Sequence, residues 1–285
     1  MLNQHSQVGI AQIVFYVPAV LAAITLFLFR KQVKGLPRFA WYVLTLFTLV
    51  RLAGGIVVIL YENNSSSTGL AIASVILLNA GVFPCIAATI GFIKIMLVQN
   101  TFPDLVFATT FSKTMPHSTH IDYKHDRVLH YLVVTSRLLF LAGIGLLVGG
   151  GVLEGNYNDQ SSVQTGIKLS RAGYCVVAAF VGTLLLFLAF FWVKRQTLSS
   201  TSLLVLRGVT MAVPFFIVRL TYAFLSVYRG AEDKTWDSLS GPIAPFLVMG
   251  LLMEYFVVVI YLYTGFKIKK TVDVVPDGEI LALAK

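Results

Sequence analysis

Acidic residues are scarce in this chain, and only one of them lies deep within a long apolar segment. The 285 residues include 13 Asp and Glu against 22 Lys and Arg, and 57% of all residues are hydrophobic. Glu254 stands near the middle of MGLLMEYFVVVIYLY, which covers residues 249–263. Because a charge at such a depth in hydrocarbon costs several kcal/mol, this side chain needs either a partner or a purpose.

The sequence also lacks the patterns of a disulfide-stabilised or nucleotide-binding domain. Cys85 and Cys175 fall inside apolar segments, which argues against a disulfide and predicts buried thiols. The Gly-rich run 143–151 lacks the preceding strand that a nucleotide-binding loop requires. Its Gly145 and Gly149 instead form a small-xxx-small pair, which predicts close helix packing.

No motif for a cofactor or a metal ion stands out. Four of the five histidines, His117, His120, His125 and His130, lie in HSTHIDYKHDRVLH, but their spacing does not follow a standard zinc pattern. We therefore interpret residues 117–130 as a polar linker and expect neither a metal nor a cofactor.

Long apolar segments are abundant and predict an all-α integral membrane protein. Each is longer than the roughly 18 residues that a membrane-spanning helix needs. They predict seven spans at about 9–29, 39–61, 70–98, 128–150, 169–193, 203–228 and 243–266. We expect one seven-helix domain over residues 1–270 and a short tail over 271–285, because no connection is long enough for a soluble domain.

The basic residues predict the orientation of these spans. Most of them flank one set of span ends, and the opposite set holds only Lys168, Arg229 and Lys234. This bias places the N-terminus in the lumen or outside and the C-terminus in the cytoplasm. The net charge of +9 is thus explained by topology and by contact with anionic lipid, so we expect no nucleic-acid partner.

A polar turn after the second span offers a separate indication of orientation. In ENNSSSTG, Asn63 and Asn64 each begin an N-x-S/T sequence, which can be glycosylated only on the lumenal side. We expect a glycoprotein of the endoplasmic reticulum membrane, with its oligomeric state left open.

The candidate site combines Glu254 with arginines that lie inside other spans. Arg51 lies deep in the second span and Arg219 about nine residues from the end of the sixth, so either one can pair with Glu254. Helical spacing places Tyr222 beside Arg219, and Tyr261 two turns beyond Glu254 on the same face. These five residues are the predicted catalytic group.

Two interpretations of Glu254 remain open from the residues alone. It can be a buried salt bridge that fixes helix register, or a proton donor that lines a cavity. The two conflict, because a carboxylate held beside an arginine is a worse acid.

Four stretches carry a resemblance to a known group of proteins. They are VGIAQIVFYVPAV, VRLAGG, FIVRLTYAF and EYFVVVIYLYTG, and they resemble a family of small seven-span membrane proteins of filamentous fungi. Within it the chain is similar to the membrane-bound terpene cyclases of meroterpenoid pathways, the macrophorin and ascofuranone type. The resemblance covers nearly all of the chain up to about Phe266.

The resemblance implies a reaction and a substrate class. It implies cyclisation of a prenylated aromatic or polyketide whose terpene chain has been epoxidised, in an aromatic-lined membrane cavity, with one acid and no cofactor. Two other classes stay in view, a seven-span receptor-like protein and a lipid-transporter-like protein. The layout of spans alone does not decide between them.

Overall fold

The fold is helical throughout the part of the chain that the structure describes. The computed structural model describes residues 4–31, 38–64, 67, 69–70, 73–74, 77, 82–101, 123–154, 159–193, 195–230, 233–236 and 241–268. Every regular element within these ranges is a helix. The tail 271–285 and the first part of the His-containing segment, residues 117–122, lie outside the described residues.

The helices follow one another in the order that the apolar segments predict. They are α1 (Gln4–Lys31), α2 (Phe39–Asn63), α4 (Val82–Thr101), α6 (Tyr123–Glu154), α7 (Gln160–Val193), α8 (Ser200–Arg229), α9 (Ile243–Pro245), the π-helical segment η3 (Phe246–Leu252) and α10 (Met253–Lys267). Two 3-10 turns, η1 (Arg195–Thr197) and η2 (Lys234–Trp236), complete the elements of the described residues.

Five of these helical stretches are long and apolar enough to span a membrane. They are Gln7–Phe29, Phe39–Asn63, Gln160–Val193, Ser200–Arg229 and Ile243–Lys267. Shorter apolar helices, Val82–Met96 and Leu138–Glu154, lie at the two remaining expected places. Large apolar side chains such as Leu186, which is 74% exposed, and Leu21, which is 62% exposed, cover the outside. Such a surface suits lipid and indicates an integral membrane protein.

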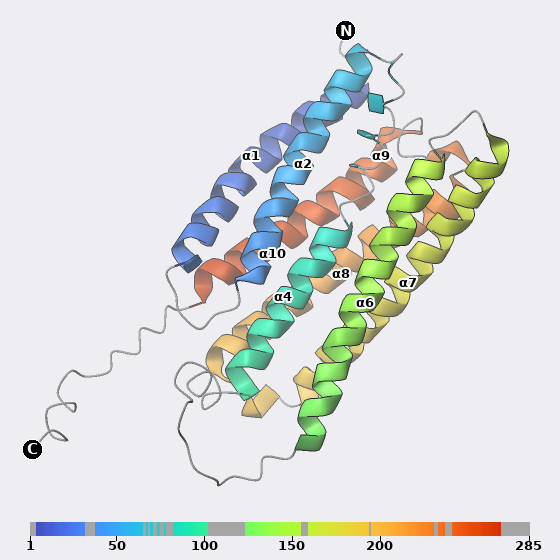
Figure 1. Cartoon of the computed structure of the whole chain (residues 1–285). Helices are drawn as coiled ribbons and strands as arrows, with labels where there is room; N and C mark the ends of the chain where they lie inside the picture. Colours follow the sequence, from blue (N-terminus) through green and yellow to red (C-terminus); the bar gives the residue numbers. More distant parts are fainter. Residues whose placement is uncertain are drawn as a thin grey trace, which may run out of the picture.

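The helices are arranged as two pairs around a central group (Figure 1). α1 packs along α2, and α6 packs along α7. Between the pairs, α4, α8 and α10 pack on one another, while α2 contacts α4 and α7 contacts α8. The sequence predicts a closed ring in which the second, sixth and seventh spans are neighbours. In the structure α8 and α10 do pack together, but the main contacts of α2 are with α1 and α4.

Polar caps begin two of the long helices. Ser199 precedes α8, and its side chain accepts a hydrogen bond from the backbone N–H of Ser202. Asp159 precedes α7 and accepts hydrogen bonds from the side chain of Ser162 and from Ser161. These bonds hold the pKa of the exposed Asp159 carboxyl below its usual value, so the cap stays ionised at neutral pH.

Glycines set the closest helix contacts, but not the glycines that the sequence pattern singles out. Gly145 faces open space, because nothing lies within 4 Å of a Cβ placed there, and at Gly149 a Cβ would make only an ordinary contact. The α6–α7 contact instead uses Gly150 and Gly166, where a Cβ on either would collide with the facing backbone. A helix has more than one small-residue face, and the sequence does not say which face meets a partner.

The tightest approach between α2 and α4 lies at Gly91. A Cβ at this position would lie 2.6 Å from the Cα of Ala40, so the two backbones would have to move apart to accept one.

The two cysteines differ in burial. Cys85 on α4 is buried as expected, whereas Cys175 on α7 is exposed, contrary to the prediction of a buried thiol.

We predict opposite effects for the same substitution at two glycines. Gly91→Ala should lower the free energy of unfolding by about 1–3 kcal/mol, because it overpacks the α2–α4 contact. Gly145→Ala should leave stability unchanged or raise it by up to about 1 kcal/mol, since it adds helix propensity in open space. Thermal melting of both variants in detergent checks this, and equal melting temperatures would contradict the close approach.

Candidate functional site

Glu254 lies at the centre of a fully buried ion-pair cluster. Its side chain is 1% exposed, and Arg51 and Arg219 are buried to the same degree. The Arg219 Nε donates to Oε1 of Glu254 at 2.5 Å, and the Arg51 Nη2 pairs with Oε2. The predicted pairing of Glu254 with Arg51 or Arg219 is therefore confirmed, and the structure shows that both arginines take part. We call these three residues the ion-pair cluster.

Arg51 is positioned by groups from three segments. Its Nη1 donates to the carbonyl oxygen of Leu77 at 3.2 Å, and its guanidinium lies 5.9 Å from the centre of the Phe47 ring. The Arg51 backbone carbonyl accepts a hydrogen bond of 2.6 Å from Nε2 of Gln12 on α1. A long side chain with this many contacts is held in one orientation, in which Nη1 bonds the Leu77 carbonyl and Nη2 contacts the Glu254 carboxylate.

Arg219 is backed by aromatic rings from α8, η2 and η3. Its guanidinium lies 5.8 Å from the centre of the buried Tyr222 ring. That ring packs against Phe246 and Trp236, at 6.1 and 6.4 Å between centroids. Tyr222 therefore joins Arg219 as the sequence predicts, and a cation over an aromatic face is stabilised by the ring quadrupole.

The π-helical segment η3 lies directly before Glu254. It covers Phe246–Leu252, and α10 begins at Met253, so Glu254 falls in the first turn of the α-helical part. Within η3, Gly250 leaves room for Phe246 and Tyr222, because a Cβ there would lie 3.2 Å from the Phe246 ring. Single π-helical turns inside longer helices are frequent at functional sites.

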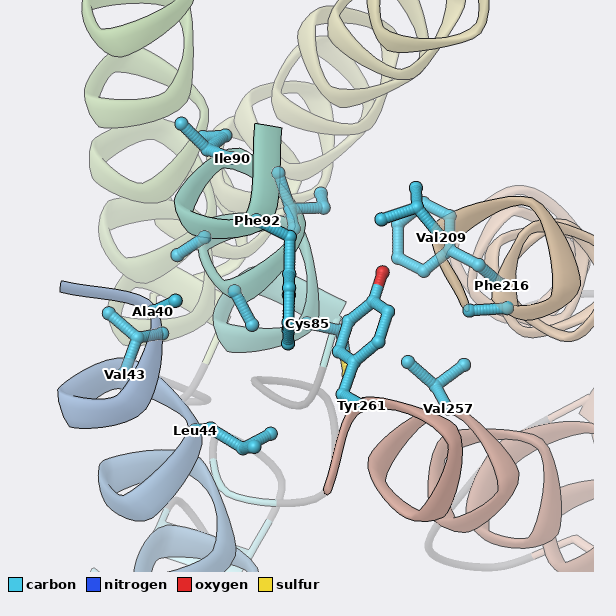
Figure 2. Close-up of a cluster of buried hydrophobic side chains, with 14 of the residues drawn as sticks. Ala40, Val43, Leu44, Cys85, Ile90, Phe92, Val209, Phe216, Val257 and Tyr261 are labelled. Carbon is cyan, nitrogen blue, oxygen red and sulfur yellow. The ribbon is translucent and has the colours of Figure 1, made fainter. Parts of the chain in front are cut away.

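Tyr261 belongs to a different cluster from the other four predicted residues. Its hydroxyl shares a 2.5 Å hydrogen bond with Thr89 Oγ1, which also donates to the Cys85 carbonyl at 2.8 Å. Figure 2 shows the Tyr261 ring extending from α10 between α4, with Phe92, and α8, with Phe216. It is seven residues beyond Glu254, or about 10 Å along a helix, so a shared face does not bring it to the carboxylate.

A small cavity lies beside the Tyr261 hydroxyl. It measures about 20 Å³ and is lined by α4, α7, α8 and α10, including Thr89, Val209 and Phe216. A space of this size holds one water molecule and no prenyl chain. The aromatic cavity expected from the resemblance is therefore not open at this place in the described structure.

Two buried polar residues on α1 that the sequence analysis did not single out also face the cluster. Tyr16 is fully buried, and its ring packs edge-on against Phe47, whose ring lies beside the Arg51 guanidinium. Gln12, one turn earlier, bonds the Arg51 carbonyl. The sequence carried a signal for both, since Gln12 is the one amide within the apolar segment 9–29 and Tyr16 follows at i+4 on the same face.

The cluster combines one carboxylate with two guanidinium groups. Both carboxylate oxygens of Glu254 contact an arginine, so in this arrangement its role is that of an ion-pair partner. Of the 13 acidic residues, Glu254 alone lies deep within the apolar segments, and two arginines contact it. Among the described residues, no three His, Cys, Asp or Glu side chains gather as a metal site requires.

The predicted glycosylation residues lie at the far end of α2. Asn63 is the last residue of this helix and Asn64 is its C-cap, and both side chains are exposed. Exposure makes them accessible to a modifying enzyme, provided that this end of the helix faces the lumen.

The sequence matches one described family along most of its length. The family carries the description "Domain of unknown function (DUF7702)", and the match covers residues 2–114 and 107–271. No curated protein and no solved structure matches the chain.

We predict that neutralising Glu254 destabilises the protein and that removing one arginine partly restores it. Glu254→Gln leaves two buried guanidinium groups without their carboxylate, and breaking such a pair costs about 3–5 kcal/mol. Glu254→Gln combined with Arg219→Gln returns the net charge of the cluster to its original value and should melt at a higher temperature than the single variant.

Glu62→Gln, near the exposed end of α2, is the control for loss of a carboxylate outside the ion-pair cluster. Melting temperatures of all three variants in detergent provide the measurement. If Glu254→Gln melts with the wild type, the ion pair contributes nothing to stability.

Proposed function

Because the chain belongs to the DUF7702 family, whose description names no activity, we propose a function from the ion-pair cluster itself. We propose that the protein is a membrane-embedded terpene cyclase that closes rings in an epoxidised prenyl chain. The observation that carries this proposal is Glu254, the one fully buried carboxylate among the described residues, in the first turn of α10. The sequence resemblance to membrane-bound meroterpenoid cyclases supports it.

The reaction needs one acid and no redox partner. A protonated Glu254 gives its proton to the epoxide oxygen as the C–O bond breaks, and the electron pair of that bond goes to the oxygen. The π electrons of the next alkene then form a C–C bond to the cationic carbon. Loss of a proton from the final cation returns the proton balance to zero, so the substrate is isomerised and no cofactor is consumed.

The surrounding side chains suit a cationic intermediate. Tyr16, Phe47 and Tyr255 form a connected aromatic group, with centroid separations of 6.3 Å for Tyr16–Phe47 and 5.9 Å for Tyr16–Tyr255. Ring faces stabilise a developing positive charge without acting as nucleophiles. Arg51 and Arg219 would position the oxygen of the substrate, and Tyr222 would hold Arg219.

Catalysis on this scheme requires a second arrangement of the cluster. Glu254 must take up a proton, so at least one arginine has to move away from its carboxylate. A prenyl chain also needs far more space than the cavity beside Tyr261 provides. A π-helical segment next to Glu254 is a place where such a rearrangement can occur, because its backbone hydrogen bonds are less regular than those of an α-helix.

We predict that Glu254→Gln abolishes ring closure. Membranes from a heterologous host that express the protein are supplied with an epoxidised farnesyl-phenol, and cyclised product is measured by mass spectrometry. Glu254→Asp keeps an acid, displaced by one methylene, and should retain residual turnover, while Glu62→Gln should match the wild type. Turnover is normalised to the amount of monodisperse protein, so that lost stability is not mistaken for lost chemistry.

Two results would count against this proposal. Equal product from Glu254→Gln would remove the general-acid role. No product from the wild type with several epoxidised prenyl-phenols would remove the cyclase function itself.

The second candidate is a receptor-like or lipid-transporter-like protein in which the ion-pair cluster is a conformational lock. This candidate is favoured by the complete burial of the cluster and by its position between α2, α8 and α10. If the cluster is a lock, Glu254 variants should change a ligand response or a transport rate, and neither the wild type nor the variants should form a cyclised product. Assays of the same membranes for cyclised product therefore distinguish the two functions.

The finer topology is also part of the proposal. We propose seven spans in the endoplasmic reticulum membrane, with the N-terminus in the lumen. The bias of basic residues toward one set of helix ends supports this orientation.

Glycosylation tests the orientation directly. Asn63 and Asn64 should carry a glycan that endoglycosidase removes, seen as faster migration in a gel. Replacing both by Gln should give the faster migration without enzyme. The control is an N-x-T sequence introduced in the predicted cytoplasmic segment 32–37, which should stay unmodified; glycosylation there would reverse the orientation.

A further inference from the structure

Two exposed arginines lie on the outside of the protein where α7 ends and α8 begins. Arg195 belongs to the turn η1 between these helices, and Arg207 lies near the start of α8. Both side chains are exposed, and neither forms an ion pair with a carboxylate among the described residues. They differ in this from the buried arginines of the ion-pair cluster, and their charge is directed at the surroundings of the protein.

One hydrogen bond between α7 and α8 brings the two arginines to the same end of this helix pair. The indole Nε1 of Trp192 donates to Thr210 Oγ1 at 2.7 Å, and the same hydroxyl donates to the carbonyl of Leu206 at 2.8 Å. Arg195 follows Trp192 by three residues, and Arg207 precedes Thr210 by three, so both lie on the same side of this bond. The Arg195 guanidinium lies 5.8 Å from the centre of the Trp192 ring.

Exposed apolar side chains cover both helices next to the arginines. On α7, Leu186, Phe190 and Val193 share one face and are 74%, 44% and 84% exposed. On α8, Met211 follows Arg207 by one turn and is 63% exposed. Such side chains suit contact with acyl chains, and tryptophans such as Trp192 are enriched where acyl chains meet headgroups. The arginines therefore lie at the depth of the lipid headgroups.

The chemistry of this surface suits a molecule that has both hydrocarbon chains and a phosphate. Guanidinium groups bind phosphate with two hydrogen bonds each in a geometry that matches the anion. A soluble phosphate would leave the neighbouring apolar side chains uncovered, whereas a phospholipid covers them with its acyl chains. Because two positive charges lie together, a headgroup with a net negative charge is favoured over one that also carries an ammonium group.

We propose that the surface formed by Trp192, Arg195, Arg207 and Met211 is a binding site for an anionic phospholipid. The lipid phosphate accepts hydrogen bonds from the two guanidinium groups, and the acyl chains lie along the apolar faces of α7 and α8. In the proposed orientation this end of the bundle faces the cytoplasmic leaflet, where anionic lipids gather. Binding in a symmetric bilayer requires neither ring closure nor that orientation, so it is tested apart from both.

Trp192 makes occupation of the site measurable, because brominated acyl chains quench tryptophan fluorescence on contact. The protein is placed in phosphatidylcholine nanodiscs in which a rising fraction of the lipid is replaced by dibrominated phosphatidylglycerol or by dibrominated phosphatidylcholine. Phosphatidylglycerol should quench Trp192 at a lower fraction than phosphatidylcholine does. Trp192→Phe gives the quenching of the other two tryptophans, which is subtracted.

Charge variants test the two arginines. Arg195→Gln and Arg207→Gln should each reduce the preference for phosphatidylglycerol about fivefold, the usual contribution of one basic residue near an anionic headgroup. The double Gln variant should show no preference, whereas replacement of both arginines by Lys keeps the charge and should retain most of it. Both positions are exposed, so all these variants should melt with the wild type.

Arg38→Gln is the matched control for general attraction to the basic end of the bundle. Arg38 is an exposed arginine directly before α2. It lies at the same end, because the start of α2 contacts the end of α10 through Trp41 and Gly265, as the start of α8 does through Gly208 and Thr264. This variant should keep the full preference for phosphatidylglycerol.

Three results would overturn the proposal. They are equal quenching by the two brominated lipids in the wild type, an unchanged preference in the double Gln variant, and a loss in Arg38→Gln as large as in that variant. Inorganic phosphate, compared with chloride at equal ionic strength, should not relieve the quenching by phosphatidylglycerol. Relief by phosphate would assign the site to a soluble anion and reject the lipid.

Discussion

One carboxylate between two arginines holds together three helices that are distant in sequence. Glu254 on α10 bonds Arg219 on α8 and Arg51 on α2, although α2 makes its main contacts with α1 and α4. Apolar side chains gain little by packing against each other in place of lipid, so a buried ion pair is a strong source of specificity inside a membrane. The register of the last span relative to its neighbours depends on this contact.

The same interaction limits the chemistry of the protein. While both arginines contact Glu254, both of its carboxylate oxygens are engaged, so an acid role needs a second arrangement of the cluster.

Much of the cluster could be predicted from the sequence, because charge in hydrocarbon is so unfavourable that only a few residues can neutralise Glu254. That argument identified Arg51 and Arg219 without any structure. It failed for Tyr261, which shares a helical face with Glu254 but bonds Thr89 on α4 instead. Two residues on the same face of a helix can still be far apart along its axis, and they then contact different neighbouring helices.

The sequence by itself determined the helical membrane class, the approximate span positions and the identity of the buried charges. These follow from local hydropathy and from the cost of burying charge, which need no knowledge of neighbours. Only the tertiary structure decided that both arginines bind Glu254, that Gln12 and the ring of Tyr16 lie beside them, and that Gly150 and Gly166, not Gly145, form the close helix contact. These contacts depend on which helix faces pack together. An apolar helix has several faces that could pack, and the sequence pattern does not distinguish between them.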